Sequence, residues 1–209
     1  MSKTTEHIIK NKIDVNSYDG IDDEYFTGPV RLKIAYLHGL ESKQGGPKVE
    51  WLKSLGHVVF APPLRYSEDF MFKNTEFLIE MFEADVIIGS SMGGRYAYYM
   101  GKLLNTPVML LNPALGQDDT LFDAYSEIDK TGDLQSKVYL GVGENDDVIS
   151  PLKTVDFLLH ETDEFDMNNY MKGEHTHRTP VEFFKDFALK FLPMINNNEW
   201  FACAMVDGI

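Results

Sequence analysis

The chain has 209 residues, of which 44% are hydrophobic and 12% are aromatic. This composition suffices for one domain with a sizeable core and excludes a disordered chain. The formal net charge is −14, with 33 acidic against 19 basic residues, and no run of lysine or arginine offsets it, so we expect no nucleic-acid partner.

The cysteine content and the N-terminus favour an intracellular setting. Cys203 is the single cysteine and cannot form an intrachain disulfide. The first seven residues, Met-Ser-Lys-Thr-Thr-Glu-His, are not followed by the apolar segment of a signal peptide. The chain contains no run of about eighteen apolar residues, so we expect no membrane-spanning helix. We therefore expect a cytoplasmic protein.

Short apolar runs alternate along the chain with longer amphipathic stretches. The apolar runs predict strands over residues 31–37, 57–61, 84–88, 108–111, 137–142 and 164–171. The amphipathic stretches predict helices over residues 47–55, 68–83, 92–104, 151–161 and 180–192. This alternation indicates a single α/β domain, with a mostly parallel sheet of about six or seven strands and helices on both faces.

Three segments depart from the alternation. Residues 1–30 are polar and acidic, and we expect them to form an N-terminal arm. Residues 114–136, rich in Gly and Asp, predict a small lid-like insertion within a domain that spans residues 31–192. Residues 193–209 are expected to form a C-terminal tail.

A candidate nucleophile lies between the third predicted strand and the helix after it. Residues 89–93 read Gly-Ser-Ser-Met-Gly. A nucleophilic serine on a sharp strand-to-helix turn needs small residues two positions to either side. Ser91 has glycines there, whereas Ser90 would be flanked by the bulky Ile88 and Met92. We therefore predict that Ser91 is the nucleophile; the alternative is a tight glycine turn with no chemistry.

Two backbone N–H groups are candidates for binding an oxyanion. One belongs to Met92, which begins the helix after the nucleophile, where the helix dipole favours negative charge. The other belongs to Leu40, in the loop after the first predicted strand. His38 in the same loop is interpreted as a structural residue that orients the loop.

The acid that would orient a catalytic histidine is expected after the strand at 137–142. Glu144-Asn145-Asp146-Asp147 follows that strand. A buried carboxylate fixes the tautomer of the imidazole and stabilises its protonated form. Asp146 fits the usual spacing from the strand, Asp147 is the next candidate, and Glu144 is third. The alternative is that these acids only cap the loop or the helix after Pro151.

The base is expected in Gly173-Glu174-His175-Thr176-His177, between the last predicted strand and the final helix. We predict His175, with His177 as the second choice. The chain order Ser, Asp, His is the order that α/β-hydrolases use. His175 and His177 could together hold a metal with His38, but the chain has no cysteine pair and no His-Glu-x-x-His helix. We expect no metal and no cofactor.

Five stretches carry a resemblance to a known group of proteins: Tyr36–Ser42, Gly46–Lys48, Leu55–Pro62, Ile88–Gly94 and Leu111–Ala114. Over residues 31–192 the chain resembles the α/β-hydrolase superfamily, and more narrowly the small bacterial esterases of the YqiA type. The resemblance implies a compact hydrolase with little cap that acts on acyl esters or thioesters. It also implies that Ser91, Asp146 and His175 form the triad. The acidic arm and the doubled Asp146-Asp147 depart from the pattern.

These features predict a serine hydrolase that cleaves small-molecule carboxylic esters or thioesters with small acyl groups through an acyl-enzyme. Two alternatives stay open at this point. One is an acyltransferase that uses the same triad, and the other is a non-catalytic binding protein on a hydrolase scaffold.

Overall fold

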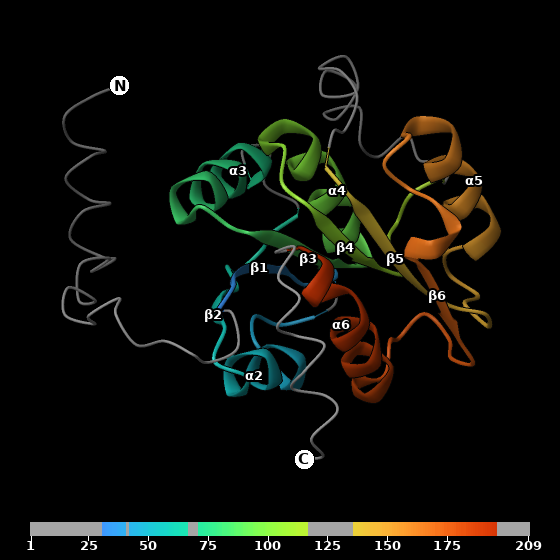
Figure 1. Cartoon of the computed structure of the whole chain (residues 1–209), viewed down its shortest axis with the longest axis horizontal. Helices are drawn as coiled ribbons and strands as arrows, with labels where there is room; N and C mark the ends of the chain where they lie inside the picture. Colours follow the sequence, from blue (N-terminus) through green and yellow to red (C-terminus); the bar gives the residue numbers. More distant parts are fainter. Residues whose placement is uncertain (1–30, 41, 67–70, 117–135, 196–209) are drawn as a thin grey trace.

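The structure, a computed structural model, describes residues 31–40, 42–66, 71–116 and 136–195. In these ranges six strands form one sheet in the order β2-β1-β3-β4-β5-β6, and every neighbouring pair is parallel (Figure 1). The prediction of a parallel sheet is confirmed. The strands are β1 (Lys33–Leu37), β2 (Val58–Phe60), β3 (Val86–Ser90), β4 (Val108–Leu111), β5 (Val138–Gly143) and β6 (Tyr170–Gly173).

Helices cover both faces of the sheet, as predicted (Figure 1). The helices are α2 (Pro47–Ser54), α3 (Met71–Phe82), α4 (Met92–Leu104), α5 (Pro151–Glu161) and α6 (Val181–Ile195). Alternate side chains of each strand point to opposite faces, so Ala35 and Leu37 pack in the core with α3, α4 and α5. Ile34 and Tyr36 pack on the other face with α2 and α6.

Local signals account for where several helices begin and end. Ser150 accepts a hydrogen bond from the Lys153 N–H at 3.4 Å and Pro151 follows it, two features that favour a helix start. α4 ends where Asn105 takes a left-handed conformation with φ of 50°. None of the described helices is both long enough and apolar enough to cross a membrane.

Several predicted boundaries differ from the structure, and three elements show the larger differences. The strand predicted at 164–171 is wrong over most of its length, because Met167–Asn169 form a 3-10 turn and β6 begins at Tyr170. The Asp166 side chain starts this turn by accepting a hydrogen bond from the Asn168 N–H at 2.6 Å. α6 continues to Ile195 and so includes the first residues of the predicted tail. β3 begins and ends two residues later than predicted.

Other predicted segments lie outside the described residues. They are the arm at 1–30, residues 117–135 of the lid-like insertion, and the tail from residue 196 onward.

The parallel sheet brings the residues that follow each strand to one edge. β1, β3, β4, β5 and β6 run in the same direction, so the loops after their carboxyl ends lie next to one another. Ligands bind at this edge of an open α/β sheet. The predicted nucleophile, acid and base all follow one of these strands.

Candidate active site

Ser91 lies at the sharp turn between β3 and α4. Its φ of 56° is a left-handed conformation that residues with a side chain seldom adopt. A Cβ on Gly89 would lie 2.2 Å from the Gly93 oxygen, and a Cβ on Gly93 would lie 2.2 Å from the Leu37 oxygen. Both flanking glycines are therefore required by the backbone that crowds this turn.

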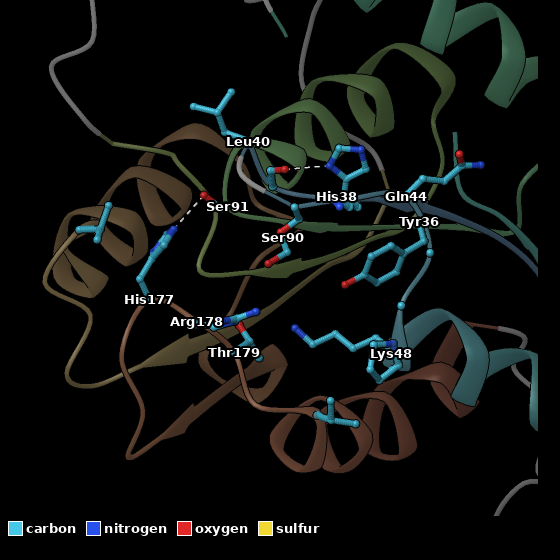
Figure 2. A pocket seen from close by; sticks show the side chains of 18 residues that line it. Tyr36, His38, Leu40, Gln44, Lys48, Ser90, Ser91, His177, Arg178 and Thr179 are labelled. Carbon is cyan, nitrogen blue, oxygen red and sulfur yellow. Dashed lines mark hydrogen bonds between the residues drawn. The ribbon is translucent and has the colours of Figure 1, made fainter. Parts of the chain in front are cut away.

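The Ser91 side chain is held by His177, which is in turn held by Asp146. Ser91 Oγ lies 2.9 Å from His177 Nε2, and His177 Nδ1 lies 2.8 Å from Asp146 Oδ2 (Figure 2). Because a carboxylate only accepts, Nδ1 donates to Asp146, and Nε2 is left to accept the Ser91 hydroxyl proton. Ser91 is the residue before the first turn of α4, yet its side chain makes no capping hydrogen bond to that helix.

The structure places His175, the histidine predicted as the base, away from Ser91. Its Nδ1 donates to the Thr176 oxygen at 2.8 Å, and its Nε2 is buried without a hydrogen-bond partner among the described residues. The ring packs against Phe183, with ring centroids 4.5 Å apart. In this geometry the second choice, His177, is the histidine that meets the serine, and the first choice, His175, is not.

The position of His175 follows from the backbone just after β6. The His175 N–H donates to the Gly173 oxygen at 2.8 Å, and its oxygen accepts from the Asn145 N–H at 3.1 Å. These bonds keep residue 175 against the ends of β5 and β6. Two more residues are needed for the loop to reach across to Ser91, and this brings His177 there.

Asp146 is the carboxylate that the structure brings to the histidine. Its side chain is only 1% exposed, and its Oδ1 accepts from the N–H groups of Val148 and Ile149, both at 2.9 Å. Asp147 is exposed, and Glu144 pairs instead with Lys172 on β6. Of the three predicted acids, only Asp146 contacts His177 within the described residues.

The two predicted oxyanion donors come from segments that lie next to Ser91. Met92 is the first residue of α4, where backbone N–H groups have no partner within the helix. Leu40 lines the same cleft as Ser91, and a Cβ on the preceding Gly39 would lie 3.2 Å from the Ser91 Cβ. The loop after β1 therefore passes directly beside the turn that carries Ser91.

His38 holds this loop in place. Its Nδ1 donates to the Gly39 oxygen at 2.8 Å, and its Nε2 accepts from the Leu64 N–H at 3.2 Å. The Tyr66 hydroxyl donates to the His38 oxygen. This geometry agrees with the interpretation of His38 as a residue that orients the loop.

Asn112, for which the sequence predicted no role, joins two loops. One is the loop after β5 that carries Asp146 (the acid loop), and the other is the loop after β6 that carries His177 (the histidine loop). Asn112 follows β4 directly, and its Oδ1 accepts from the Gly143 N–H at 2.7 Å. Its Nδ2 donates to the oxygens of His177 at 2.7 Å and Thr176 at 3.2 Å. The signal that could have found it is a polar residue directly after a buried strand, the same signal that marks the acid.

A cleft of about 830 Å³ opens beside Ser91. Ser91 and His177 lie at one side of it, and the first turn of α2 lies at the other (Figure 2). The lining side chains include Tyr36, Lys48 and Arg178. Among the described residues, no three His, Cys, Asp or Glu side chains gather in a way that could hold a metal ion.

Comparisons with known proteins identify the family of the chain. The model of the uncharacterised protein family UPF0227 matches residues 33–150, which is more than half of the chain. A search of curated proteins finds no match.

Solved structures with the same architecture share little sequence with the chain. One is MGS-MChE2, an α/β hydrolase enzyme from the metagenome of sediments from the lagoon of Mar Chica, Morocco. It has a TM-score of 0.57 and 16% identity, over 85% of this chain and 94% of that one. Another is acetyl xylan esterase 1 from Thermoanaerobacterium sp. JW/SL YS485, with a TM-score of 0.54 and 18% identity, over 81% and 76%. At these identities the likeness establishes the fold, which is that of an α/β hydrolase.

Proposed function

The chain belongs to the protein family UPF0227 and has an α/β-hydrolase fold, and from this we propose that it is a serine hydrolase that cleaves carboxylic esters or thioesters. The observation that carries the proposal is the hydrogen-bonded series from Ser91 through His177 to Asp146. A nucleophile in contact with a base, and the base in contact with an orienting carboxylate, is the arrangement that activates a serine hydroxyl.

In the first half of the reaction His177 acts as a base and then as an acid. Its Nε2 removes the proton of Ser91 as Oγ attacks the acyl carbonyl, and the buried Asp146 stabilises the imidazolium that forms. The N–H groups of Leu40 and Met92 donate to the oxyanion of the tetrahedral intermediate. His177 then protonates the leaving alcohol or thiol, and the acyl group stays on Ser91.

In the second half, water takes the place of the leaving group. His177 removes a proton from the water as it attacks the acyl carbonyl, and then returns a proton to Ser91 Oγ as the acid is released. The cleft favours small acyl groups, because a long acyl chain requires an extended apolar wall. Its apolar side chains are few and are drawn from different segments: Leu40, Pro47, Val148 and Val181.

A fluorophosphonate probe tests the nucleophile directly, because it reacts with an activated serine. We expect the wild-type protein to be labelled at Ser91 and to hydrolyse p-nitrophenyl butyrate. Ser91→Ala should lose both properties, with kcat reduced by roughly 10⁴-fold or more.

Ser90→Ala is the matched control, since the same hydroxyl is removed one position away. It should keep labelling and hydrolysis, because Ser90 makes no hydrogen bond to His177 among the described contacts. Full activity in a folded Ser91→Ala protein would overturn the proposal.

A further inference from the structure

The wall of the cleft that faces Ser91 is cationic, although the chain as a whole is strongly acidic. The net charge is −14, yet the described residues that line the cleft include Lys43, Lys48 and Arg178 and no aspartate or glutamate. The whole chain has 33 acidic and 19 basic residues, so a set of residues chosen at random would contain more acidic than basic side chains. The cleft is therefore a local exception to the charge of the protein.

Lys48 and Arg178 come from different elements and meet in this cleft. Lys48 lies in the first turn of α2, and Arg178 lies in the loop between β6 and α6, next to His177 (Figure 2). Neither forms an ion pair with a carboxylate among the described residues. By contrast, Lys53 on the same helix pairs with Glu50 at 3.3 Å.

Bringing these two cations together has an energetic cost. Burial, and next the charge of Arg178, lower the pKa of Lys48 to about 8. Like charges at close range disfavour the charged form, and desolvation adds to the effect. An anion between the two side chains would remove this repulsion.

The donors around the cation pair point to the same ligand chemistry. Tyr36 is only 5% exposed, and its hydroxyl makes no hydrogen bond among the described residues, although it lines the cleft. Burial raises the pKa of Tyr36, which keeps the phenol as a neutral donor. In Figure 2 its oxygen points toward the ends of Lys48 and Arg178.

The start of α2 adds its own partial positive charge. Gly46 precedes the first turn of α2 and supplies no side-chain cap, and Gly46 and Pro47 both line the cleft. The N–H groups in the first turn of a helix favour anions. The helix start, the cation pair and the buried phenol thus face one space.

We propose that Lys48, Arg178 and Tyr36 form a subsite for an anionic group of the substrate, a carboxylate or a phosphate, whose ester bond lies at Ser91. The inference rests on the proposed hydrolase function and names its substrate class. Arg178 suits this role because its planar guanidinium binds carboxylate and phosphate oxygens in pairs, and its place next to His177 puts the subsite beside the reacting bond.

The test compares p-nitrophenyl esters whose acyl chains have the same three methylene groups. The neutral ester is the pentanoate, the carboxylate ester is the glutarate monoester, and the phosphonate ester is the 4-phosphonobutanoate. A fourth, 3-carboxy-4-nitrophenyl pentanoate, carries its carboxylate on the leaving group. We expect at least one anionic ester to exceed the pentanoate in kcat/KM by roughly tenfold or more. Which ester gains shows whether the subsite takes a carboxylate or a phosphate.

Four variants separate the subsite from general charge effects. Lys48→Gln and Arg178→Gln should each lower the ratio of kcat/KM for the preferred anionic ester to kcat/KM for the pentanoate by roughly ten- to hundred-fold. Lys48→Arg should restore most of the preference. Lys53→Gln is the control, since it removes the same charge from an exposed position on the same helix. Circular dichroism and thermal unfolding check that each variant is folded.

A binding measurement keeps the inference separate from the proposed function. Calorimetry with Ser91→Ala and each of the three anionic esters should detect binding of at least one of them, and this binding should be lost when Lys48→Gln is added and kept when Lys53→Gln is added. A wild-type protein that hydrolyses the pentanoate but shows no anionic preference, and no effect of Lys48→Gln, would overturn the subsite and leave the hydrolase. A protein that cleaves no ester would overturn the hydrolase, and the calorimetry would still decide whether the subsite exists.

Discussion

His177 Nε2 lies 2.9 Å from Ser91 Oγ, although the two residues are 86 positions apart in the chain. The contact joins the turn after β3 to the loop after β6, across the ends of β4 and β5. The serine and the histidine are therefore fixed by different parts of the sheet. Each part of the site can be tested by itself.

The two histidines of the loop after β6 should behave differently when removed. His177→Ala takes away the base in contact with Ser91, and we expect kcat for p-nitrophenyl butyrate to fall by roughly 10⁴- to 10⁶-fold. His175→Ala should keep most of this activity. This variant removes the buried His175 ring that packs against Phe183, so we expect the free energy of unfolding to fall by roughly 1–3 kcal/mol. Steady-state kinetics and chemical denaturation measure the two effects, and the reverse pattern would return the base to His175.

The paired aspartates after β5 provide a matched comparison. Asp146→Asn keeps an oxygen for the N–H groups of Val148 and Ile149 but loses the carboxylate that orients His177. We expect kcat to fall by roughly 10⁴-fold. Asp147→Asn makes the same chemical change at an exposed residue and should leave kcat within about twofold. Equal losses in the two variants would contradict the assignment of the acid.

Asn112 should affect turnover more than substrate binding. Asn112→Asp keeps the oxygen that accepts from the Gly143 N–H, but it places a carboxylate against the oxygens of Thr176 and His177. The histidine loop should move, and we expect kcat to fall by roughly ten- to hundred-fold with a smaller change in KM. Asn145→Asp, at an exposed position in the acid loop, is the control. A change confined to KM would count against a positioning role for Asn112.

The preference for an anionic ester should weaken as the pH rises. Burial and Arg178 lower the pKa of Lys48 to about 8, so Lys48 carries its charge below that pH and loses it above. The other titratable groups that line the cleft among the described residues are Tyr36, whose raised pKa keeps it protonated, and His38, Lys43, His177 and Arg178.

The measurement is the ratio of kcat/KM for the preferred anionic ester to kcat/KM for the pentanoate. Both esters require the same chemical step at Ser91, so the pH dependence of that step cancels in the ratio. We expect the ratio to fall by roughly tenfold between about pH 7 and pH 9.5. In Lys48→Arg the ratio should stay level, because a guanidinium remains charged throughout. A level ratio in the wild-type protein would contradict the role of Lys48.

Much of this site could be predicted from local sequence, because Ser91 and Asp146 follow strands whose apolar runs are plain. Gly89 and Gly93 can be read directly from the sequence, and they indicate the sharp turn that Ser91 occupies. The base was harder to predict, because His175 and His177 lie two residues apart in the same loop. Only the folded backbone shows which of the two side chains reaches Ser91.

Features that depend on distant parts of the chain could not be predicted. Lys48 and Arg178 each read as an ordinary surface cation, and only the folded sheet brings them into one cleft. The role of Asn112 likewise depends on three loops meeting at one side chain. Periodicity describes how each element packs on the sheet, but it contains no information on which loop tips touch.

The bonds of Asn112 also bear on how the protein ages. Asparagine converts slowly to aspartate when the backbone nitrogen of the next residue attacks the side-chain amide, and here that change would put a negative charge between the acid loop and the histidine loop. The next residue is Pro113, whose nitrogen carries no hydrogen and sits in a ring. The attack is thereby suppressed at the one asparagine on which both loops depend, so the alignment of the site is protected against spontaneous deamidation during the lifetime of the molecule.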